Sequence, residues 1–209
     1  MSTERTKLSP PTVFIVDDDS GMLKSMETVM EIESIPTRIY PSARAFLDDY
    51  DPRQPGCLVV DMQMPAMTGT QLLEHLRASA IHIPAIMVTA HGDVPSAVNN
   101  MKLGAVEFLQ KPVDPRILVA KVREALELDS VRRVESEEGS ACRERLSTLT
   151  NRETEALDFL VSGLSNKQIA LEMGISIKTV EHHREHIMAK TRAVNGADLV
   201  RMKMLNGNH

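Results

Sequence analysis

The sequence predicts an α/β domain with a doubly wound, five-stranded parallel sheet, a (βα)5 arrangement, followed by a small all-α domain. Two observations support this. In residues 1–128, short apolar or β-branched runs alternate with segments of helical length, which is typical of a parallel sheet covered on both faces. From residue 147 to 209 the apolar spacing is purely helical. Residues 129–146 are highly charged and lack an apolar stripe, so we expect a linker there, whose start could extend the preceding helix.

The predicted elements of the first domain follow in chain order. The predicted strands cover residues 13–16, 35–40, 57–60, 85–88 and 106–109. The predicted helices cover roughly residues 20–33, 42–49, 68–79, 94–103 and 115–128. Pro36 cannot donate a hydrogen bond to a central ladder, so its strand should lie at an edge of the sheet.

Local capping chemistry supports several of these helices. Thr68 and Gln71 form a capping-box pattern, and Asp114 before Pro115 places an N-cap ahead of a first-position proline. Gly104 is well placed to end the fourth helix. These signals set helix starts at about residues 68 and 115.

The sequence of the second domain predicts four helices, of which the second and third form a helix-turn-helix. Capping-box patterns at Thr150/Glu153 and Ser165/Gln168 precede the first two helices. The second helix covers 166–173, a turn follows at 174–176, and the third helix runs from residue 177 to about 191. A last helix covers roughly residues 195–205.

Composition excludes several classes of protein. The chain has 209 residues and a net charge of −5, and no run approaches the roughly 18 apolar residues of a membrane span. The N-terminal residues lack the apolar stretch of a signal peptide. Its two cysteines, Cys57 and Cys142, are too few for a disulfide framework or a closed zinc site. We therefore expect a soluble, cytoplasmic protein without membrane partners.

Polar residues stand where four predicted strands end. Asp17, Asp18 and Asp19 follow the first strand, Asp61 ends the third, Thr89 ends the fourth, and Lys111 follows the fifth. Functional groups of a doubly wound sheet converge at these carboxyl ends. Clustered carboxylates suit Mg²⁺, and one of them could attack phosphorus to form an aspartyl phosphate. Each residue alone could instead be a turn or surface residue, and one aspartate of the triplet could cap the next helix.

The strings TVFIVDDD, CLVVDMQMPAMTG, IMVTAHGD and AVEFLQKP resemble the receiver domain of two-component response regulators. The resemblance implies a flavodoxin-like fold with Asp61 as phosphoacceptor. It implies that Mg²⁺ is held by Asp17, Asp18, Asp61 and the main-chain carbonyl of Gln63. It also makes Thr89, Lys111 and the aromatic Phe108 the switch residues, and it implies a cis peptide bond between Lys111 and Pro112. Asp19 receives no role from it and is expected to be structural.

The segment LTNRETEALDFLVSGLSNKQIALEMGISIKTVEHHREHIMAKT resembles the LuxR-type DNA-binding domain, so the whole chain resembles a FixJ/LuxR-type response regulator. The resemblance implies that Glu181, His182 and Glu185 point at base edges. It places five residues nearer the phosphates: Lys167, Lys178, Thr179, Arg184 and Lys190. It also implies that the last helix is a dimerisation helix.

The acidic residues of the third helix of this domain depart from the pattern of many relatives, which carry lysine at positions 181 and 185. A carboxylate can accept a hydrogen bond from cytosine N4, although it repels phosphate. The alternative is an intrahelical pair, such as Glu181 with Arg184 or Glu185 with Lys178. A zinc site built on the nearby histidines is disfavoured, because no H-E-x-x-H motif or distant third ligand is present.

These features predict a phosphorylation-controlled transcription factor rather than an enzyme. A sensor histidine kinase would supply the phosphoryl group, and phosphorylation on Asp61 would promote homodimerisation and binding to double-stranded DNA. RNA polymerase is a further candidate partner. An aspartyl-phosphate phosphatase of the haloacid-dehalogenase kind would require a second acidic residue at position 63, where this chain has Gln63. The alternative function is a phospho-switched module whose helical domain docks a protein partner rather than DNA.

Overall fold

The computed structural model describes residues 10–90, 101 and 103–207. The chain divides into two compact units, Met1–Arg132 and Arg133–His209. Helix α5 contributes its beginning to the first unit and its end to the second.

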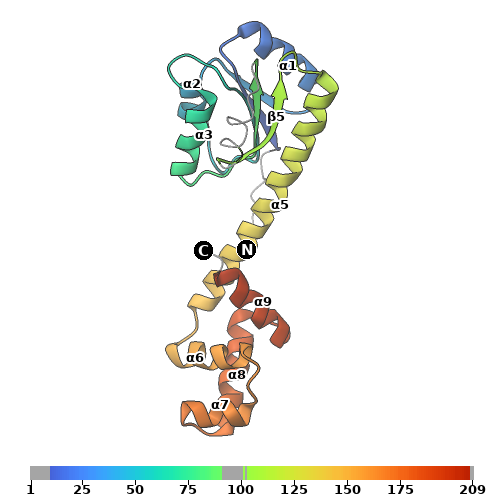
Figure 1. Ribbon diagram of the computed structural model, residues 1–209. Helices are drawn as coiled ribbons and strands as arrows, with labels where there is room; N and C mark the ends of the chain where they lie inside the picture. The colour runs from blue at the N-terminus through green and yellow to red at the C-terminus, as the bar shows by residue number, and fades with distance from the viewer. Residues whose placement is uncertain (1–9, 91–100, 102, 208–209) are drawn as a thin grey trace, which may run out of the picture. The chain divides into compact units, whose positions relative to one another are not determined.

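The first unit is the predicted five-stranded parallel sheet with helices on both faces (Figure 1). The strands are β1 (Thr12–Val16), β2 (Thr37–Tyr40), β3 (Gly56–Asp61), β4 (Ala85–Thr89) and β5 (Ala105–Gln110). The helices are α1 (Ser20–Ile32), α2 (Ala43–Asp49), α3 (Gly69–Ala78) and α5 (Pro115–Ser147). The strand order is β2-β1-β3-β4-β5, with every neighbouring pair parallel. This order confirms the doubly wound fold and places β2, which follows Pro36, at an edge.

Two apolar layers hold the helices on the sheet. Helices α1 and α5 pack on one face, where Met26 and Met30 are buried as helical core residues. Helices α2 and α3 pack on the other face, around Phe14 and Phe46. All five residues of β1 and all six of β3 are buried, as expected for central strands of a parallel sheet.

The predicted N-caps of α3 and α5 are confirmed, whereas the helix that Gly104 was expected to end lies almost entirely outside the described residues. Thr68 and Gln71 form a reciprocal capping box at the start of α3. Asp114 accepts a hydrogen bond from the Arg116 N–H at 2.8 Å as α5 begins at Pro115. Asp19 is the N-cap of α1, which confirms its structural role. The helix predicted over 94–103 falls almost entirely outside the described residues.

The segment predicted as a linker is helical throughout, because α5 continues to Ser147. We expected the preceding helix to extend only into the start of this segment, whereas it runs through all of it, for a physical reason. Its glutamate, arginine and alanine residues favour a helix without an apolar stripe, since few of its positions contact a core. Asp129 is buried against the sheet and accepts from the Gly56 N–H at 2.8 Å, whereas Cys142 is buried beside α9, its thiol 3.2 Å from the Met202 carbonyl.

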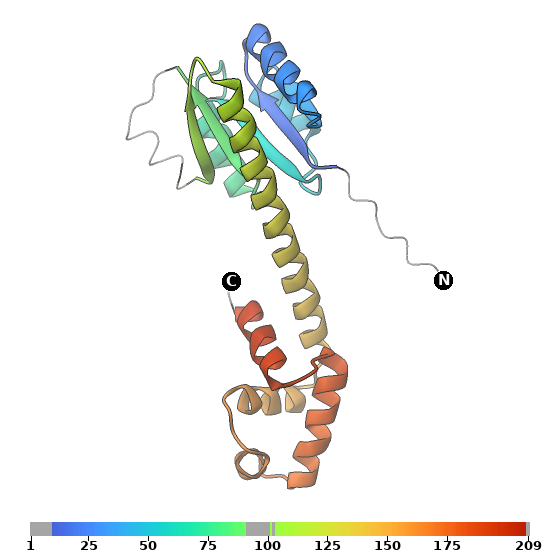
Figure 2. The same cartoon turned by 90° about the vertical axis from the view of Figure 1, so that its right-hand side faces the viewer.

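The second unit contains the predicted helix-turn-helix among its helices, which run from orange to red in Figure 2. The helices are α6 (Asn151–Val161), α7 (Asn166–Met173), α8 (Ile177–Thr191) and α9 (Gly196–Gly207). Both predicted capping boxes are present, and Gly174 ends α7 with a positive φ of 65°. The core is small and includes Leu157, Ile169, Val180, Ile187 and Leu199.

Helix α5 is the longest helix, with 33 residues. Its second half carries many acidic and basic side chains. Within the described ranges, none of the helices combines the length and the apolar character needed to cross a bilayer.

Candidate functional site

The structure brings together side chains from four strand ends. Asp61 is the last residue of β3, Asp17 follows β1, and Lys111 follows β5. The Lys111 ammonium lies 2.7 Å from Asp61 Oδ1 and 2.8 Å from Asp17 Oδ2. Thr89 ends β4 at the same edge and is buried. The predicted meeting of these residues at one rim of the sheet is therefore confirmed.

Each buried carboxylate is held by one backbone group and by the lysine. The second oxygen of Asp61 accepts from the Gln63 N–H at 2.9 Å, and that of Asp17 accepts from the Asp19 N–H at 2.9 Å. Asp17 and Asp61 are only 2% and 6% exposed. These contacts to a backbone N–H and to Lys111 fix the orientation of both carboxylates before any ligand binds.

The charges of the site favour a cation in addition to Lys111. Burial opposes the charge of the ammonium, but its hydrogen bonds to Asp17 and Asp61 prevail and raise the pKa of Lys111. Oxygens of Asp17, Asp18 and Asp61 lie within 4.8 Å of one another. Three carboxylates thus face one ammonium, and Asp18 is exposed to solvent, so hard oxygen ligands and an open side are both present. This donor set fits Mg²⁺.

Gly69 belongs to the site although its role was not predicted. A Cβ atom at this position would lie 2.4 Å from the Asp61 carbonyl oxygen, so only glycine fits at the start of α3. The Gly69 N–H donates to the Met62 carbonyl at 3.2 Å, which ties the loop after Asp61 to the helix. The sequence signal for this role was a glycine directly after Thr68, the N-cap residue of α3.

The three predicted switch residues lie on or directly after the neighbouring strands β4 and β5. The Lys111 N–H donates to the Thr89 carbonyl at 2.8 Å, which joins the ends of β4 and β5. Phe108, on β5, is paired with Met87 of β4. Its side chain is partly buried and packs against the core beneath α2 and α3. The Lys111–Pro112 peptide bond is cis, as expected.

In the second unit, α8 presents a polar surface. Its inner face buries Val180, Ile187 and Thr191. Its outer side has a shallow hollow, lined by Ser176, Lys178, Thr179, Glu181, His182 and Glu185. The three residues predicted to face bases are thus exposed and close together.

The intrahelical ion pairs considered for α8 do not form. Among the described residues, Glu181 and Glu185 have no salt bridge, although basic residues lie one turn away. Arg184 instead approaches Asn166 Oδ1 on α7 at 3.5 Å, and Lys167 and Lys178 are exposed nearby. The two carboxylates remain available to solvent or to a ligand.

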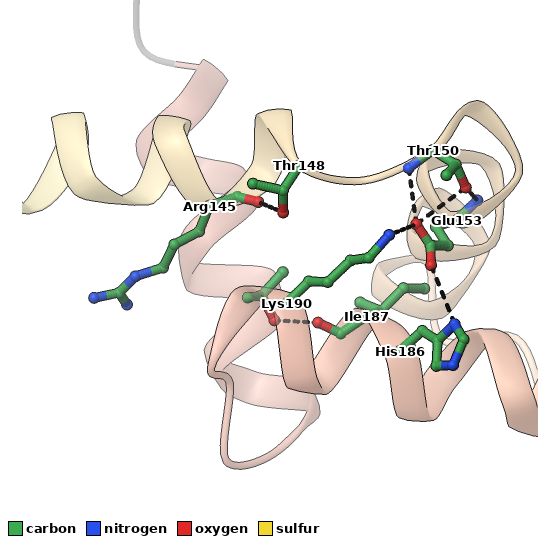
Figure 3. Close-up of polar contacts among 8 residues, drawn as sticks. Arg145, Thr148, Thr150, Glu153, His186, Ile187 and Lys190 are labelled. Atoms are coloured by element: carbon green, nitrogen blue, oxygen red, sulfur yellow. Dashed lines mark hydrogen bonds and ion pairs between the residues drawn. The ribbon is translucent and has the colours of Figure 1, made fainter.

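Lys190 has a partner inside the domain (Figure 3). Its ammonium lies 2.6 Å from Oε2 of Glu153, a residue of α6 that is 3% exposed. The same glutamate lies 3.5 Å from His186 Nδ1. The hydrogen bond from Lys190 lowers the pKa of Glu153 to about 2. Sequence reasoning placed Lys190 near DNA phosphates and missed this buried pair.

Comparison with known proteins assigns both units. Residues 13–123 match the response regulator receiver domain, and residues 147–203 match the bacterial regulatory proteins of the luxR family. The chain belongs to the two-component response regulators. It combines a receiver domain with a LuxR-type DNA-binding domain, and such a response regulator acts as a transcription factor.

Similar full-length proteins share this organisation. The transcriptional regulatory protein FixJ of Azorhizobium caulinodans is 40% identical over 195 residues, 93% of this response regulator and 92% of FixJ. The response regulator protein TodT of Pseudomonas putida is 36% identical over 190 residues, 91% of this chain and 84% of TodT. A structure of the response regulator StyR matches with a TM-score of 0.82 at 39% identity, covering 94% of this chain and 99% of StyR.

Proposed function

We propose that this response regulator is switched by phosphoryl transfer to Asp61 and that the phosphorylated form binds DNA as a homodimer. The observation that carries the proposal is the contact of Lys111 with both Asp61 and Asp17 in a buried, acidic pocket. A carboxylate held between a backbone N–H and an ammonium is positioned as a nucleophile, and the ammonium can offset charge on the incoming phosphoryl group.

The donor is the phosphohistidine of a sensor histidine kinase. An Asp61 carboxylate oxygen attacks phosphorus and forms the acyl phosphate, while the P–N bond breaks and its electron pair remains on the imidazole nitrogen, which takes up a proton. Asp17, Asp18, Asp61 and the Gln63 carbonyl would hold Mg²⁺. When bound, Mg²⁺ neutralises charge on the phosphoryl oxygens. Lys111, directly after β5, contributes a second positive charge.

The new charge at Asp61 biases the receiver toward a second arrangement. The Thr89 hydroxyl, at the end of β4, would hydrogen-bond a phosphoryl oxygen, and Phe108 would move inward on β5. The face formed by the predicted fourth helix and β5 would then be remodelled and would pair with a second copy. The part of this face formed by the predicted fourth helix lies outside the described residues. Helix α9 would extend the dimer through the DNA-binding domain.

On DNA, α8 would enter the major groove. Glu181, His182 and Glu185 would face base edges, and a carboxylate there accepts from cytosine N4. Lys167, Lys178, Arg184 and the partly buried Thr179 would contact phosphates. Lys190, expected from the sequence to do the same, is instead held by Glu153 inside the domain. RNA polymerase would be a further partner, which this protein would contact on promoter DNA. The protein would act in the cytoplasm.

The test is DNA binding by wild type and Asp61→Asn, each with and without acetyl phosphate and Mg²⁺. We expect retardation of promoter DNA to strengthen at least tenfold on phosphorylation of the wild type only. Equal affinity in all four samples would contradict phosphorylation control. Asp48→Asn, which changes an exposed aspartate on α2, is the matched control and should respond like the wild type.

A second candidate function is docking of a protein partner by the helical domain. The unpaired carboxylates Glu181 and Glu185 on the exposed side of α8 favour it, because they repel phosphate. Salt-dependent DNA retardation that is lost in the double variant Lys178→Ala, Arg184→Ala would exclude it. Retardation that is insensitive to both substitutions would support it.

A further inference from the structure

A buried carboxylate links the first helix of the DNA-binding domain to α8. Glu153 Oε2 accepts from the Thr150 N–H at 2.8 Å, from the Thr150 hydroxyl at 3.0 Å and from Lys190 at 2.6 Å. Its other oxygen, Oε1, faces Nδ1 of His186 at 3.5 Å. Figure 3 shows both α8 side chains reaching toward this one carboxylate. More donors meet here than a helix cap requires, since the capping box alone needs only Thr150.

Lys190 and His186 are four residues apart, so they lie on the same side of α8 on successive turns. Two attachment points one turn apart restrain both the rotation of a helix and its position along its axis. One point would leave the helix free to pivot. Glu153 is 3% exposed, so water competes weakly for its carboxylate, whereas the side chains of Lys190 and His186 are partly open to solvent.

His186 continues the link to the exposed surface. Its ring centroid lies 4.0 Å from that of His182, with an angle of 54° between the ring planes. His182 lines the same hollow as Glu181 and Glu185. At 3.5 Å the Glu153 carboxylate is beyond hydrogen-bond distance of Nδ1, so it acts on the ring through its charge, which favours a ring orientation with the proton on that nitrogen. A restraint on His186 is therefore also a restraint on the neighbouring His182 ring.

We propose that Glu153 is a positioning residue for DNA recognition, which holds α8 through Lys190 and orients the His186–His182 pair on the base-reading surface. The proposal rests on the proposed DNA-reading role of α8. It also gives Lys190 a role other than phosphate contact. The two roles predict different salt dependences, because each phosphate contact contributes about one unit to the slope of log affinity against log salt.

The experiment compares full-length wild type, Glu153→Gln and Lys190→Met in the presence of acetyl phosphate and Mg²⁺. The probes are a duplex that the wild type selects from random-sequence DNA and a scrambled duplex of equal composition. We expect each variant to bind the selected duplex at least tenfold more weakly and the scrambled duplex within about twofold of wild type, with an unchanged salt slope. Lys190→Arg, which keeps charge and reach, should restore most of the affinity.

The sign of the Glu153→Gln effect separates positioning from simple electrostatics. The substitution removes a negative charge, which by itself would strengthen binding to DNA. The matched control is Asp158→Asn, which removes an acidic partner of the same helix, bonded at 2.7 Å to Lys203 on α9 rather than to α8. It should leave the preference for the selected duplex unchanged. Equal or tighter binding of that duplex by folded Glu153→Gln would overturn the proposal, as would a salt slope lowered by one in Lys190→Met.

A second readout does not depend on DNA. The ¹⁵N shifts of the His186 imidazole should show the proton mainly on Nδ1 in wild type and a mixture of tautomers in Glu153→Gln. If Glu153→Gln fails to fold, His186→Gln tests the same link and should weaken selected-duplex binding at least threefold. Identical imidazole shifts in wild type and Glu153→Gln would refute the link. Failure of wild type to prefer any duplex would contradict the DNA-reading function of α8. The ¹⁵N shifts of His186 test the Glu153–His186 link separately, so they would show whether that link is present even when the DNA-reading function fails.

Discussion

Lys111 Nζ lies 2.7 Å from Asp61 Oδ1, although the two residues end different strands that are separated in the sheet by β4. The contact joins the proposed phosphoacceptor to the loop after β5, next to the Thr89 carbonyl at the end of β4. We therefore expect a change of charge at Asp61 to alter the partners of Lys111. This makes the end of β5 the natural place for the phosphorylation signal to leave the site.

Lys111→Met should change two properties in opposite directions. Without the ammonium, Asp17 and Asp61 attract Mg²⁺ more strongly, so we expect affinity for Mg²⁺ to rise several-fold by calorimetric titration. The rate of phosphorylation by acetyl phosphate should fall about 100-fold, because a charge that stabilises the transferred group is lost. Lys121→Met removes a lysine that pairs with Glu107 outside the site and should change neither property. A Lys111→Met protein that is phosphorylated at the normal rate would contradict the role of the ammonium.

Asp18→Asn should weaken Mg²⁺ binding about tenfold while leaving the fold intact, because Asp18 is exposed and the buried carboxylates keep their partners. The matched control is Asp19→Asn. Asp19 caps α1, and asparagine caps helices equally well, so that variant should bind Mg²⁺ like the wild type. Calorimetric titration with Mg²⁺ measures both. Equal weakening in the two variants would show that local charge, rather than coordination by Asp18, governs binding.

Glu181→Gln should relax sequence preference on DNA. If the carboxylate accepts from cytosine N4, its loss costs about 1–3 kcal/mol of discrimination at one base pair. Binding to unrelated DNA should become tighter, because a charge that repels phosphate is removed. Selection from random duplexes by each protein measures the preference, with Glu172→Gln, an exposed glutamate of α7, as control. An identical selected sequence for wild type and Glu181→Gln would rule out base contact by this residue.

Glu153 should make the DNA-binding domain sensitive to acid. Its pKa in the folded protein is about 2, below the ordinary 4.5, so the folded state favours the ionised carboxylate. The resulting stability is present above pH 4.5 and is lost as the pH falls from about 4.5 toward 2. Glu153→Gln should lower stability at neutral pH by about 2 kcal/mol and flatten this dependence. Amide hydrogen exchange in α6 and α8 at several pH values measures it; parallel acid profiles for both proteins would contradict the assignment.

Much of the receiver domain could be predicted from the sequence because its signals are local. The apolar runs of β1 and β3 and the proline before β2 define central and edge strands. The Thr68 and Thr150 capping boxes mark helix starts. The site itself could be placed because parallel strands end at one edge, so Asp17, Asp61 and Lys111 had to converge.

The features that could not be predicted depend on contacts between distant segments. The helical continuation of α5 lacks an apolar stripe, and its buried residues, such as Cys142, are recognisable only once α9 is in place. The partner of Lys190 depends on how α6 packs against α8. Gly69 looks like an ordinary first-turn residue until the Asp61 carbonyl is seen beside it.

Localising the phosphoryl group would show directly whether Asp61 is the phosphoacceptor. Full-length protein is treated with acetyl phosphate and Mg²⁺, the acyl phosphate is trapped by borohydride reduction, and the modified peptide is identified by mass spectrometry. The account predicts one modification, on Asp61, that is absent from Asp61→Asn. Modification of Asp17, Asp18 or a residue outside this pocket, or undiminished phosphate incorporation in Asp61→Asn, would contradict it.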